Sequence, residues 1–404
     1  MRYIYQKFRR FCAFITGFVF FISGILKVLD PVGAGLVVKE YFEFLHLGFL
    51  GFAAGFTGTA LALAETLVGA ALITGVWRKI TALTAMIMQV FFTLLTLALV
   101  IFNPQMDCGC FGEAIHLTHM ETFIKNLVLC ALLAAAYIPF RELGITKKRK
   151  YVSFAIVTVS VVSFSIYSHL YIPLVDFTEF RQAAVLQAGS AFHTAEEDRY
   201  EAVFIYAKDG QEKSFDLLHL PDSTWEYVRT ETTLKEEFRN TGVNLSFSNE
   251  DGEYMDRMAA EGDVMVISVY RPEGKAGRWE KTASFISKAA QAGYTPLLLV
   301  SSTPDDIEEI LKDVDKSAAD IIRNNLYYSD YKTLLTLNRS NGGAVWFSDG
   351  YLIRKWARRA LPDTATMSAD INGDVTEAII EKSTKGSLAF QGFLLYVFAV
   401  MLLL

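Results

Sequence analysis

The segment of this sequence best suited to chemistry is Asp107-Cys108-Gly109-Cys110-Phe111-Gly112, where one glycine separates two cysteines. Glycine lets the backbone bend, so the sulfur atoms of Cys108 and Cys110 can meet and close a small disulfide ring. A ring of this size is strained, and strained disulfides are the more easily reduced ones. The pair therefore indicates thiol–disulfide redox chemistry, and a permanent staple of a short loop is the alternative.

The neighbours of the pair indicate which thiol reacts. Asp107 precedes Cys108, and its negative charge disfavours a thiolate at that position. The helix predicted to follow begins too many residues away for its positive end to lower either thiol pKa. We therefore expect Cys110 to be the attacking thiol.

Two histidines after the pair raise the possibility of a metal site. The spacing Cys108-x-Cys110-x5-His116-x2-His119 supplies four side chains that zinc can bind. However, the stretch Thr118-His119-Met120-Glu121 is a capping box, which predicts the start of a helix. That structural role accounts for the stretch without a metal, so we predict none.

Two charged residues interrupt apolar segments of the chain. Lys27 lies near the end of the apolar run 11–29, and Glu65 lies inside the run 58–77. Charged side chains in a membrane span are costly and tend to pair or to mark a site. A lysine near a helix end can instead extend to the membrane surface. We predict a Lys27–Glu65 pair that holds a quinone head group or tunes the thiols.

These residues lie among six apolar runs, and the chain as a whole is 52% hydrophobic. A bilayer core about 30 Å thick requires about 20 mostly apolar residues in a helix. The region 36–57 is apolar and rich in glycine but carries three charges, which predicts an interfacial or re-entrant segment. The predicted spans are 11–29, 58–77, 80–102, 122–140, 151–171 and 387–404.

Lysine and arginine in the short loops predict the orientation. They gather at the amino terminus, at Arg78 and Lys79, and at 147–150, whereas the loops 30–57 and 103–120 carry few. The amino terminus is therefore expected in the cytoplasm of an inner membrane. The Cys108 loop and the domain after residue 171 are then periplasmic. A net charge of −6 favours no nucleic-acid partner.

Beyond residue 173 the composition becomes that of a soluble domain. Short strand patterns at 201–208 and 213–218 flank Asp209-Gly210, a hairpin signal, and the charged stretch 224–240 is expected to be helical. From residue 263 buried strands alternate with helices, which predicts an α/β sandwich with a mixed sheet. The expected strands are 264–270, 296–300, 325–328, 343–347 and 351–355.

This alternating region, about 262–360, resembles the thioredoxin-like fold of periplasmic thiol–disulfide proteins. Those proteins carry a reactive cysteine after the first core strand, but Tyr270-Arg271-Pro272-Glu273-Gly274 stands there in this chain. They also place a cis-proline before the strand that faces their active site, where this chain has Ser340-Asn341-Gly342-Gly343. The resemblance implies a degenerate module, without thiols, that serves docking or shape.

The membrane part carries a second resemblance. The stretches SGILKVLDP and ETLVGAALITG are similar to the DoxX family of four-helix membrane proteins. DCGCFGEAIHLTHMETFIKN resembles the Cys-x-Cys-Phe-Gly stretch of the MauE branch, named for methylamine utilisation. The whole chain is similar to Bacteroidetes DoxX-like proteins with an added periplasmic domain. DoxX relatives are linked to quinone-coupled oxidation of sulfur compounds, and MauE to disulfide formation, so the resemblance implies redox work by Cys108 and Cys110.

The sequence thus predicts an α-helical polytopic membrane bundle with a DoxX-like four-helix core and an α/β thioredoxin-like soluble domain. The function expected is electron exchange between a periplasmic protein thiol and a quinone through the Cys-x-Cys pair. The alternative is a non-catalytic membrane scaffold or assembly factor that docks a periplasmic partner. The expected divisions are the bundle 1–145, a fifth span 146–172, a β-rich linker region 173–261, the thioredoxin-like domain 262–362, a linker 363–386 and an anchor 387–404.

Reporter fusions test the orientation. Alkaline phosphatase fused after Gly210 is expected to be active, because it requires an oxidising compartment to form its disulfides. The same enzyme fused after Lys79, in a loop expected inside, should be inactive. Activity of a cytoplasm-only reporter after Gly210 would overturn both the orientation and the location of Cys108 and Cys110 in an oxidising compartment.

Overall fold

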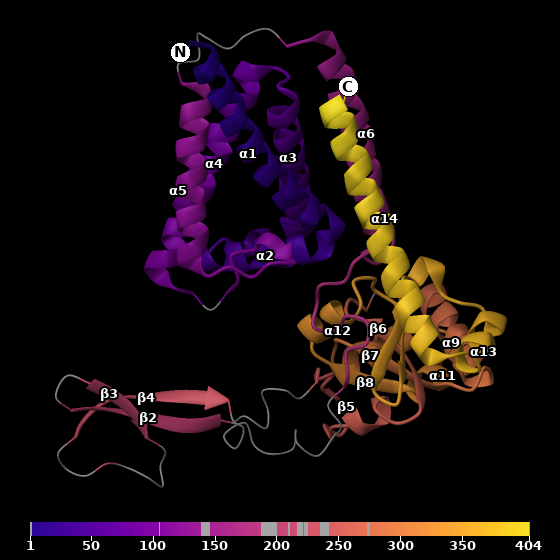
Figure 1. Cartoon of the computed structure of the whole chain (residues 1–404). Coiled ribbons are helices and arrows are strands. Elements are labelled where there is room, and N and C mark those ends of the chain that lie inside the picture. The colour runs from indigo at the N-terminus through magenta and orange to yellow at the C-terminus, as the bar shows by residue number, and fades with distance from the viewer. Residues whose placement is uncertain are drawn as a thin grey trace.

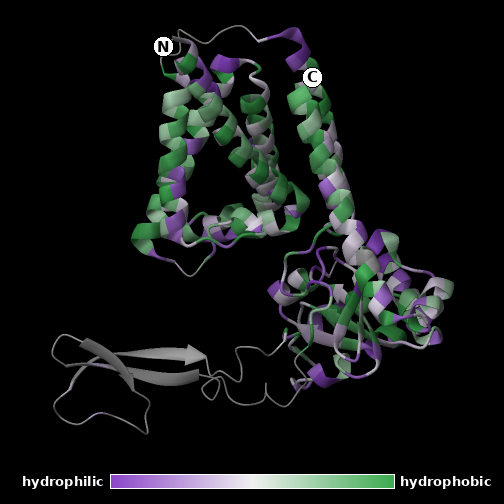
Figure 2. Cartoon of the chain, viewed as in Figure 1, coloured by the Kyte–Doolittle hydropathy of each residue, from purple (hydrophilic) through white to green (hydrophobic). Residues whose placement is uncertain are grey.

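The chain is a multi-pass membrane protein. The computed structural model describes residues 2–104, 106–138, 146–186, 200–208, 211–215, 221, 225–234, 242–272 and 275–403. Six helices in these residues are long and apolar enough to cross a membrane. In Figure 2 these helices are coloured mostly as hydrophobic along their membrane-spanning lengths, whereas the soluble domain has mixed colours. They are α1 (Arg2–Leu29), α3 (Ala54–Thr74), α4 (Arg78–Phe102), α5 (His119–Tyr137), α6 (Lys148–Leu170) and α14 (Val375–Leu403).

Helices α1, α3, α4 and α5 form the bundle that holds the cysteine loop (Figure 1). Helices α1 and α3 approach closely because glycines face each other where they cross. A Cβ on Gly69 would lie 2.7 Å from the carbonyl oxygen of Gly17 and 2.8 Å from the Cα of Phe21. Small residues of this kind let transmembrane backbones pack directly on one another. The close crossing brings polar side chains of α1 and α3 within reach of each other.

A short helix, α2 (Pro31–Phe44), lies across the end of this bundle (Figure 1). Its start is fixed by Pro31 and by Asp30, whose Oδ1 accepts a hydrogen bond of 2.9 Å from the Gly33 amide. With 14 residues it is too short to span a bilayer. A 3-10 helix, η1 (Gly48–Ala53), then leads into α3. The interfacial segment expected at 36–57 therefore corresponds to most of α2 together with η1.

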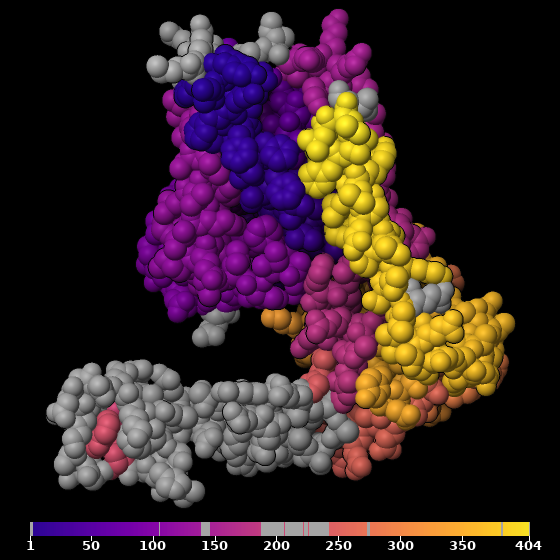
Figure 3. All heavy atoms as spheres, viewed as in Figure 1, coloured from indigo at the N-terminus to yellow at the C-terminus, as the bar shows by residue number. Residues whose placement is uncertain are grey.

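The chain beyond the bundle is carried by α6 and α14, which pack side by side. Phe164 stacks on Phe393 with ring centroids 4.5 Å apart, and the Ser153 hydroxyl donates to the Val400 carbonyl at 2.7 Å. Figure 3 shows α14, in yellow, running without a break from the membrane region onto the soluble domain. This pair joins the two parts of the molecule.

The linker expected at 363–386 is instead helical. Asp363 caps α13 (Thr364–Ile371), and α14 begins at Val375, well before the anchor expected at 387–404. The reason is packing: Met367 is fully buried in the core of the soluble domain, and Val375, Ala378 and Ile379 pack against the same core. Apolar contacts of this kind keep the segment in regular structure.

The soluble domain is built on a six-stranded mixed sheet in the order β10-β9-β6-β7-β8-β5. Strands β6, β7 and β8 run parallel, and β9 and β5 are antiparallel to their neighbours. The alternation of strands and helices predicted from residue 263 onward is confirmed. The strands are β5 (Phe247–Ser248), β6 (Asp263–Val269), β7 (Thr295–Val300), β8 (Leu326–Ser329), β9 (Gly343–Ser348) and β10 (Tyr351–Trp356). The helices are η4 (Asp256–Ala259), α9 (Ala276–Gln291), α10 (Pro304–Leu311), α11 (Lys316–Arg323), α12 (Tyr331–Leu337) and η5 (Arg358–Ala360).

Both faces of this sheet are buried, and alternate residues of β6 serve the two faces. Met265, Ile267 and Val269 enter the core beneath α9 and α11, whereas Val264 and Val266 enter the core beneath α12. Residues Val32 and Leu36 of α2 pack against this second core. The α12 side of the domain therefore faces the membrane bundle.

A separate antiparallel sheet has the order β3-β2-β4. The expected hairpin strands are confirmed as β2 (Tyr200–Lys208) and β3 (Gln211–Phe215), although Asp209 and Gly210 lie outside the described residues. The helix expected at 224–240 is wrong, because 226–234 form β4 (Glu226–Leu234), which pairs with β2. The strand is charged, but it contains three threonines together with Tyr227 and Val228, residue types that favour a paired strand.

The tight α1–α3 crossing yields a stability test. Gly69→Ala places a methyl group against the backbone of α1, and overpacking of this kind costs about 1–3 kcal/mol. We expect a lower midpoint for thermal loss of the monodisperse protein in detergent. Gly392→Ala is the matched control, because no atom lies within 4 Å of the added Cβ, and it should leave the midpoint unchanged. Equal midpoints for both variants would contradict the described crossing.

Candidate functional site

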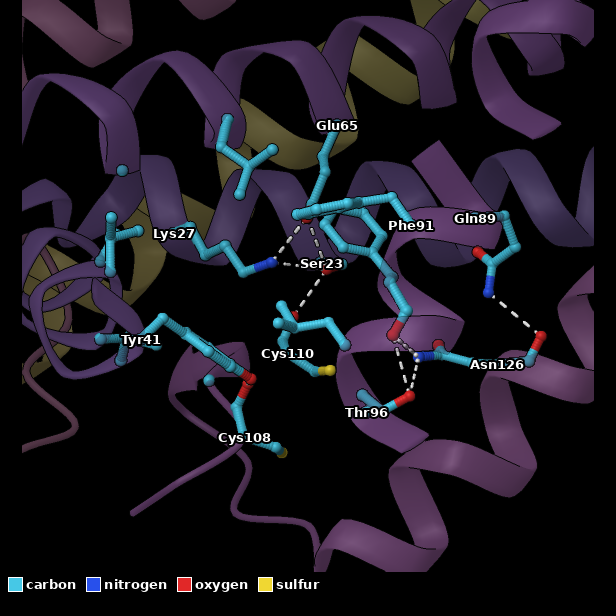
Figure 4. Close-up of a pocket in the computed structure, with 18 of the residues that line it drawn as sticks. Ser23, Lys27, Tyr41, Glu65, Gln89, Phe91, Thr96, Cys108, Cys110 and Asn126 are labelled. Carbon is cyan, nitrogen blue, oxygen red and sulfur yellow. Dashed lines mark hydrogen bonds and ion pairs between the residues drawn. The ribbon is translucent and has the colours of Figure 1, made fainter. Parts of the chain in front are cut away.

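A cavity of about 340 Å³ lies between α1, α3, α4 and α5, at the end of the bundle that α2 covers. Its wall is largely apolar, and both cysteines of the Cys-x-Cys pair line it (Figure 4). The apolar lining includes Val19, Phe20, Val37, Val38, Phe42, Leu45, Leu61, Phe91, Phe92, Leu95 and Leu129. Polar side chains also line it from Ser23, Lys27, Tyr41, Glu65, Gln89, Thr96, Lys125 and Asn126.

The expected ion pair between Lys27 and Glu65 is present in this cavity. Lys27 Nζ lies 2.7 Å from Glu65 Oε2 and 2.8 Å from Oε1. The Glu65 side chain is 3% exposed and the Lys27 side chain 12% exposed. Lys27 therefore does not extend to the membrane surface, since its ammonium group points inward to the carboxylate. A buried charge requires such a partner because its desolvation is costly.

Ser23 connects this ion pair to the cysteine loop. Its hydroxyl lies 2.8 Å from Glu65 Oε2 and 2.6 Å from the Cys110 carbonyl oxygen, and it accepts from Lys27 Nζ at 3.3 Å. A hydroxyl carries one proton, so it donates to one of the two oxygens at a time. Ser23 was not predicted from the sequence. Its position four residues before Lys27, on the same helix face, was the available signal.

The cysteine loop is shaped by Gly109, which has φ +59°. A Cβ at this position would also collide with the Val37 side chain of α2. Residues Cys110–Glu113 then form the short strand β1. The Tyr41 hydroxyl of α2 donates to the Cys108 carbonyl at 2.9 Å. Glycine is thus required both for its conformation and for its lack of a side chain, and α2 holds the loop against the cavity.

The two thiols, both free in this structure, have unequal environments. A hydrogen bond from the Cys110 thiol lowers the pKa of Cys108 to about 5, against the opposing effect of burial. The Thr122 hydroxyl adds a further hydrogen bond to the Cys108 sulfur at 3.1 Å. The same thiol–thiol hydrogen bond, together with burial, raises the pKa of Cys110 well above its usual range. Cys108 is therefore the thiol of lower pKa and Cys110 the thiol of higher pKa.

This assignment reverses the expectation that Cys110 would be the attacking thiol. The carboxylate of Asp107, which was expected to disfavour a thiolate at Cys108, faces solvent and lies 3.3 Å from His116 Nδ1. Both of those side chains are more than half exposed, so solvent screens the charge of Asp107. Donors contributed by the next helix and by the partner thiol outweigh it, and neither was evident from residue order.

The histidines do not gather into a metal site. His119 Nε2 lies 2.9 Å from the Met106 carbonyl oxygen, and His116 faces Asp107. Within the part of the chain that the structure describes, no group of three or more His, Cys, Asp or Glu side chains is placed to hold a metal ion. The predicted capping box is confirmed: Thr118 accepts from the Glu121 amide, and the Glu121 carboxylate accepts from the Thr118 amide.

The soluble domain contacts the bundle beside the cysteine loop. Arg339, in the turn between α12 and β9, lies 2.8 Å from Asp30 Oδ2 and 3.1 Å from Glu113 Oε1. Its side chain is 4% exposed, so these are buried contacts. Lys332 of α12 adds an ion pair of 3.3 Å with Glu40 of α2. Glu113 stands three residues after Cys110, so the domain meets the loop that carries the thiols.

With this geometry established, the membrane region can be compared with known families. Residues 5–139 match the family model of the methylamine utilisation protein MauE. The match covers α1 to α5 and contains every residue that lines the cavity. Residues 200–237 match a domain of unknown function, DUF8463, which covers the sheet β3-β2-β4. Searches among curated proteins and among solved structures find no match.

The MauE-matching region is thus the part that places two thiols, an ion pair and an apolar cavity together. The DoxX relation and the thioredoxin-like character of the soluble domain stay predictions.

The unequal thiols predict a pH dependence of alkylation. Because the pKa of Cys108 is lowered to about 5, its thiolate persists as pH falls through the neutral range. Its iodoacetamide rate should change less than about twofold between pH 8 and pH 6, whereas a thiol of pKa about 8.5 loses about 75-fold. Mass spectrometry identifies the modified cysteine.

The hydroxyl of Thr122 provides the matched pair of variants. Thr122→Val should raise the pH midpoint of Cys108 alkylation, because the thiolate loses a donor. Thr122→Ser keeps the hydroxyl and should retain the low midpoint. A midpoint near 8.5 in the unmodified protein would show that Cys108 is an ordinary thiol.

Proposed function

We propose that the protein is a membrane-bound thiol–disulfide redox protein, which exchanges electrons between a periplasmic protein thiol and a quinone through Cys108 and Cys110. The observation that carries this proposal is a shared cavity. The two thiols line the same apolar space as the buried Lys27–Glu65 pair. A cleft that combines titratable groups of this kind with an apolar wall is typical of a ligand-binding site.

The residues of the cavity fit a quinone. Its volume of about 340 Å³ is within the range of small-molecule sites, and Phe91 and Phe92 offer aromatic surfaces to a flat ring. The ammonium group of Lys27 can donate to a ring oxygen, and Glu65 with Ser23 can hold and pass a proton. When bound, a quinone supplies an acceptor for the two electrons and two protons released as two thiols become a disulfide.

The chain's own thiols divide the exchange between them. A partner thiolate attacks the sulfur of Cys110 in the Cys108–Cys110 disulfide, and Cys108 leaves as the thiolate. A second partner thiolate then attacks the partner's own sulfur in the mixed disulfide, releasing Cys110 and forming the partner's disulfide. Two features favour this order. The thiol of lower pKa leaves faster, and Cys110 is partly exposed whereas Cys108 is buried.

The orientation proposed is amino terminus inside, with the domain in the periplasm of a bacterium. In Figure 1 both termini lie at one end of the bundle and the soluble domain lies at the other. The basic residues Arg78 and Lys79, and those of 147–150, lie at the end of the termini. The positive-inside rule supports this assignment. It also supports an oxidising compartment for the Cys108 loop.

The region 262–360 is proposed as a degenerate thioredoxin-like module. Its parallel strands β6 and β7, followed by the hairpin β9–β10, support the resemblance. The sequence has no cysteine in this domain. Arg339 lies just before β9, the place where the resemblance expects the substrate-facing loop, and it contacts the membrane bundle. The module is therefore proposed to position the cysteine loop and its partner without exchanging thiols itself.

A scaffold or assembly factor is the second candidate function. The observation that favours it is the separate sheet β3-β2-β4, which lies apart from the six-stranded sheet in Figure 1. In this case Cys108 and Cys110 form a permanent staple. The two functions are distinguished by whether the pair changes its redox state.

Alkylation trapping in cells tests the redox function. Both thiols should be oxidised in respiring cells and become reduced when quinone synthesis is blocked. In Cys108→Ser, the Cys110 thiolate can attack the disulfide of an oxidised partner and release one partner thiolate. The mixed disulfide should accumulate because Cys108 is missing and cannot displace the partner, whereas Cys110→Ser should accumulate none. A pair that stays fully oxidised in both conditions is a staple, which favours the scaffold function.

Glu65→Gln belongs in the same experiment. The substitution removes the ion pair with Lys27 and the proton-carrying group, so reoxidation of the pair should slow by about 10-fold or more. Gly392→Ala serves as a control variant for membrane insertion and yield. Unchanged reoxidation in Glu65→Gln would show that Glu65 is structural only.

A further inference from the structure

Two buried amide side chains line the cavity from α4 and α5 and have no part in the exchange described above. Gln89 is 1% exposed and Asn126 is 3% exposed. Gln89 Nε2 donates to the Asn126 backbone carbonyl at 3.1 Å, and Asn126 Nδ2 donates to the Phe92 carbonyl at 3.3 Å. Carbonyl oxygens only accept hydrogen bonds, so these contacts fix which end of each amide is nitrogen.

The amide oxygen of Gln89 is consequently an acceptor available to the cavity. Among the described residues, the hydrogen bonds of Gln89 and Asn126 use their nitrogens, and no donor reaches the Gln89 side-chain oxygen. Figure 4 shows this oxygen on the side of the amide nearer Phe91, away from Asn126. This oxygen is not one of the fully enclosed side-chain atoms, so it stays reachable from the cavity and can accept from a ligand that supplies a donor.

The cavity thus has two chemically different polar ends. At one end in Figure 4, Lys27 can give a ring oxygen the N–H that otherwise contacts Ser23 at 3.3 Å, and Lys125 adds a second cation to the lining. Gln89 offers a buried acceptor at the other. A quinone has two carbonyl oxygens, which only accept, whereas a hydroquinone has two hydroxyl groups, which can donate as well as accept. Only the reduced ring satisfies both ends.

We infer that Gln89 is a specificity-determining residue, which makes the cavity bind a hydroquinone more tightly than the corresponding quinone. This inference rests on the proposed function and deepens it. A site that binds one redox state more tightly shifts the equilibrium toward that state. Preferential binding of the hydroquinone therefore favours electron flow from Cys108 and Cys110 to the ring.

The test compares two redox forms of one ligand in a protein that cannot oxidise or reduce them. Cys108→Ser/Cys110→Ser protein is prepared in nanodiscs under argon, and binding of duroquinone and durohydroquinone is measured by calorimetry. Duroquinone is fully substituted, so it does not add to the remaining thiols of Cys12 and Cys130. We expect durohydroquinone to bind about 3–10-fold more tightly, the effect of one net hydrogen bond.

Gln89→Met in this background keeps the side-chain length but removes the acceptor oxygen. The preference for durohydroquinone should fall to within twofold of duroquinone. Thr93→Val is the matched control, because Thr93 lies one turn along α4, bonds to the Gln89 backbone and does not line the cavity. It should keep the preference. A Gln89→Met protein that keeps the preference would overturn the inference.

A measurement without a variant at Gln89 guards against misfolding. The dimethyl ether of durohydroquinone lacks both donors, and it should bind the same protein at least threefold more weakly than durohydroquinone. Equal affinities would overturn the inference. This outcome is distinguishable from failure of the proposed function. If the Cys108–Cys110 pair cycles with quinone but the affinities are equal, only the inference about Gln89 is contradicted. A pair that never cycles removes the redox function, whatever the ligand preference.

Discussion

The buried ion pair between Lys27 and Glu65 is the contact on which the architecture of the membrane region depends. It joins α1 to α3 inside the bundle, where an unpaired charge would be strongly destabilising. The pair forms only because glycines let the two helices approach, as at Gly69. Through Ser23 it also holds the backbone of Cys110. Helix packing, charge pairing and the placement of the thiols are therefore parts of a single arrangement.

A second set of charges extends this arrangement to the soluble domain. Asp30 caps α2 and at the same time receives Arg339 of the soluble domain. Arg339 also reaches Glu113, at the end of the strand that begins with Cys110. Arg339 is buried, so its charge requires both acidic partners. A change in the conformation of the cysteine loop moves Glu113 and therefore alters the surroundings of that charge. The cysteine loop and the soluble domain are consequently coupled through Arg339, Asp30 and Glu113.

Much of this could be predicted from the sequence. The lengths of the apolar runs predicted the six spans. The alternation of strand and helix patterns predicted the order of elements in the soluble domain. The cost of burying a charge predicted the contact between Lys27 and Glu65. These signals are local or follow from strong energetic constraints. The wrong helix at 224–240 and the unpredicted helices within 363–386 have a shared cause. Both segments have a polar composition, but contacts with residues distant in the sequence determine their structure.

The details of the site were less accessible because they depend on residues distant in sequence. The hydrogen bonds that distinguish Cys108 from Cys110 come from Thr122 and from the fold of the loop, whereas residue order pointed to Asp107. Gln89 gave no signal at all, since a glutamine in an apolar helix has many structural uses. The role inferred for Gln89 depends on the hydrogen bond that its side-chain nitrogen donates to the Asn126 carbonyl, because this bond identifies the other end of the amide as oxygen.

The inequality of the two thiols and the acceptor of Gln89 act in the same direction. Stabilising the Cys108 thiolate stabilises the reduced form of the pair, and this makes its disulfide a stronger oxidant toward a partner thiol. A stronger oxidant is harder to regenerate, so it needs an electron acceptor that is itself favourably reduced in place. A cavity that binds the hydroquinone more tightly provides such an acceptor. In the proposed exchange, electron flow from partner to thiols to ring would follow from these two local hydrogen-bond patterns.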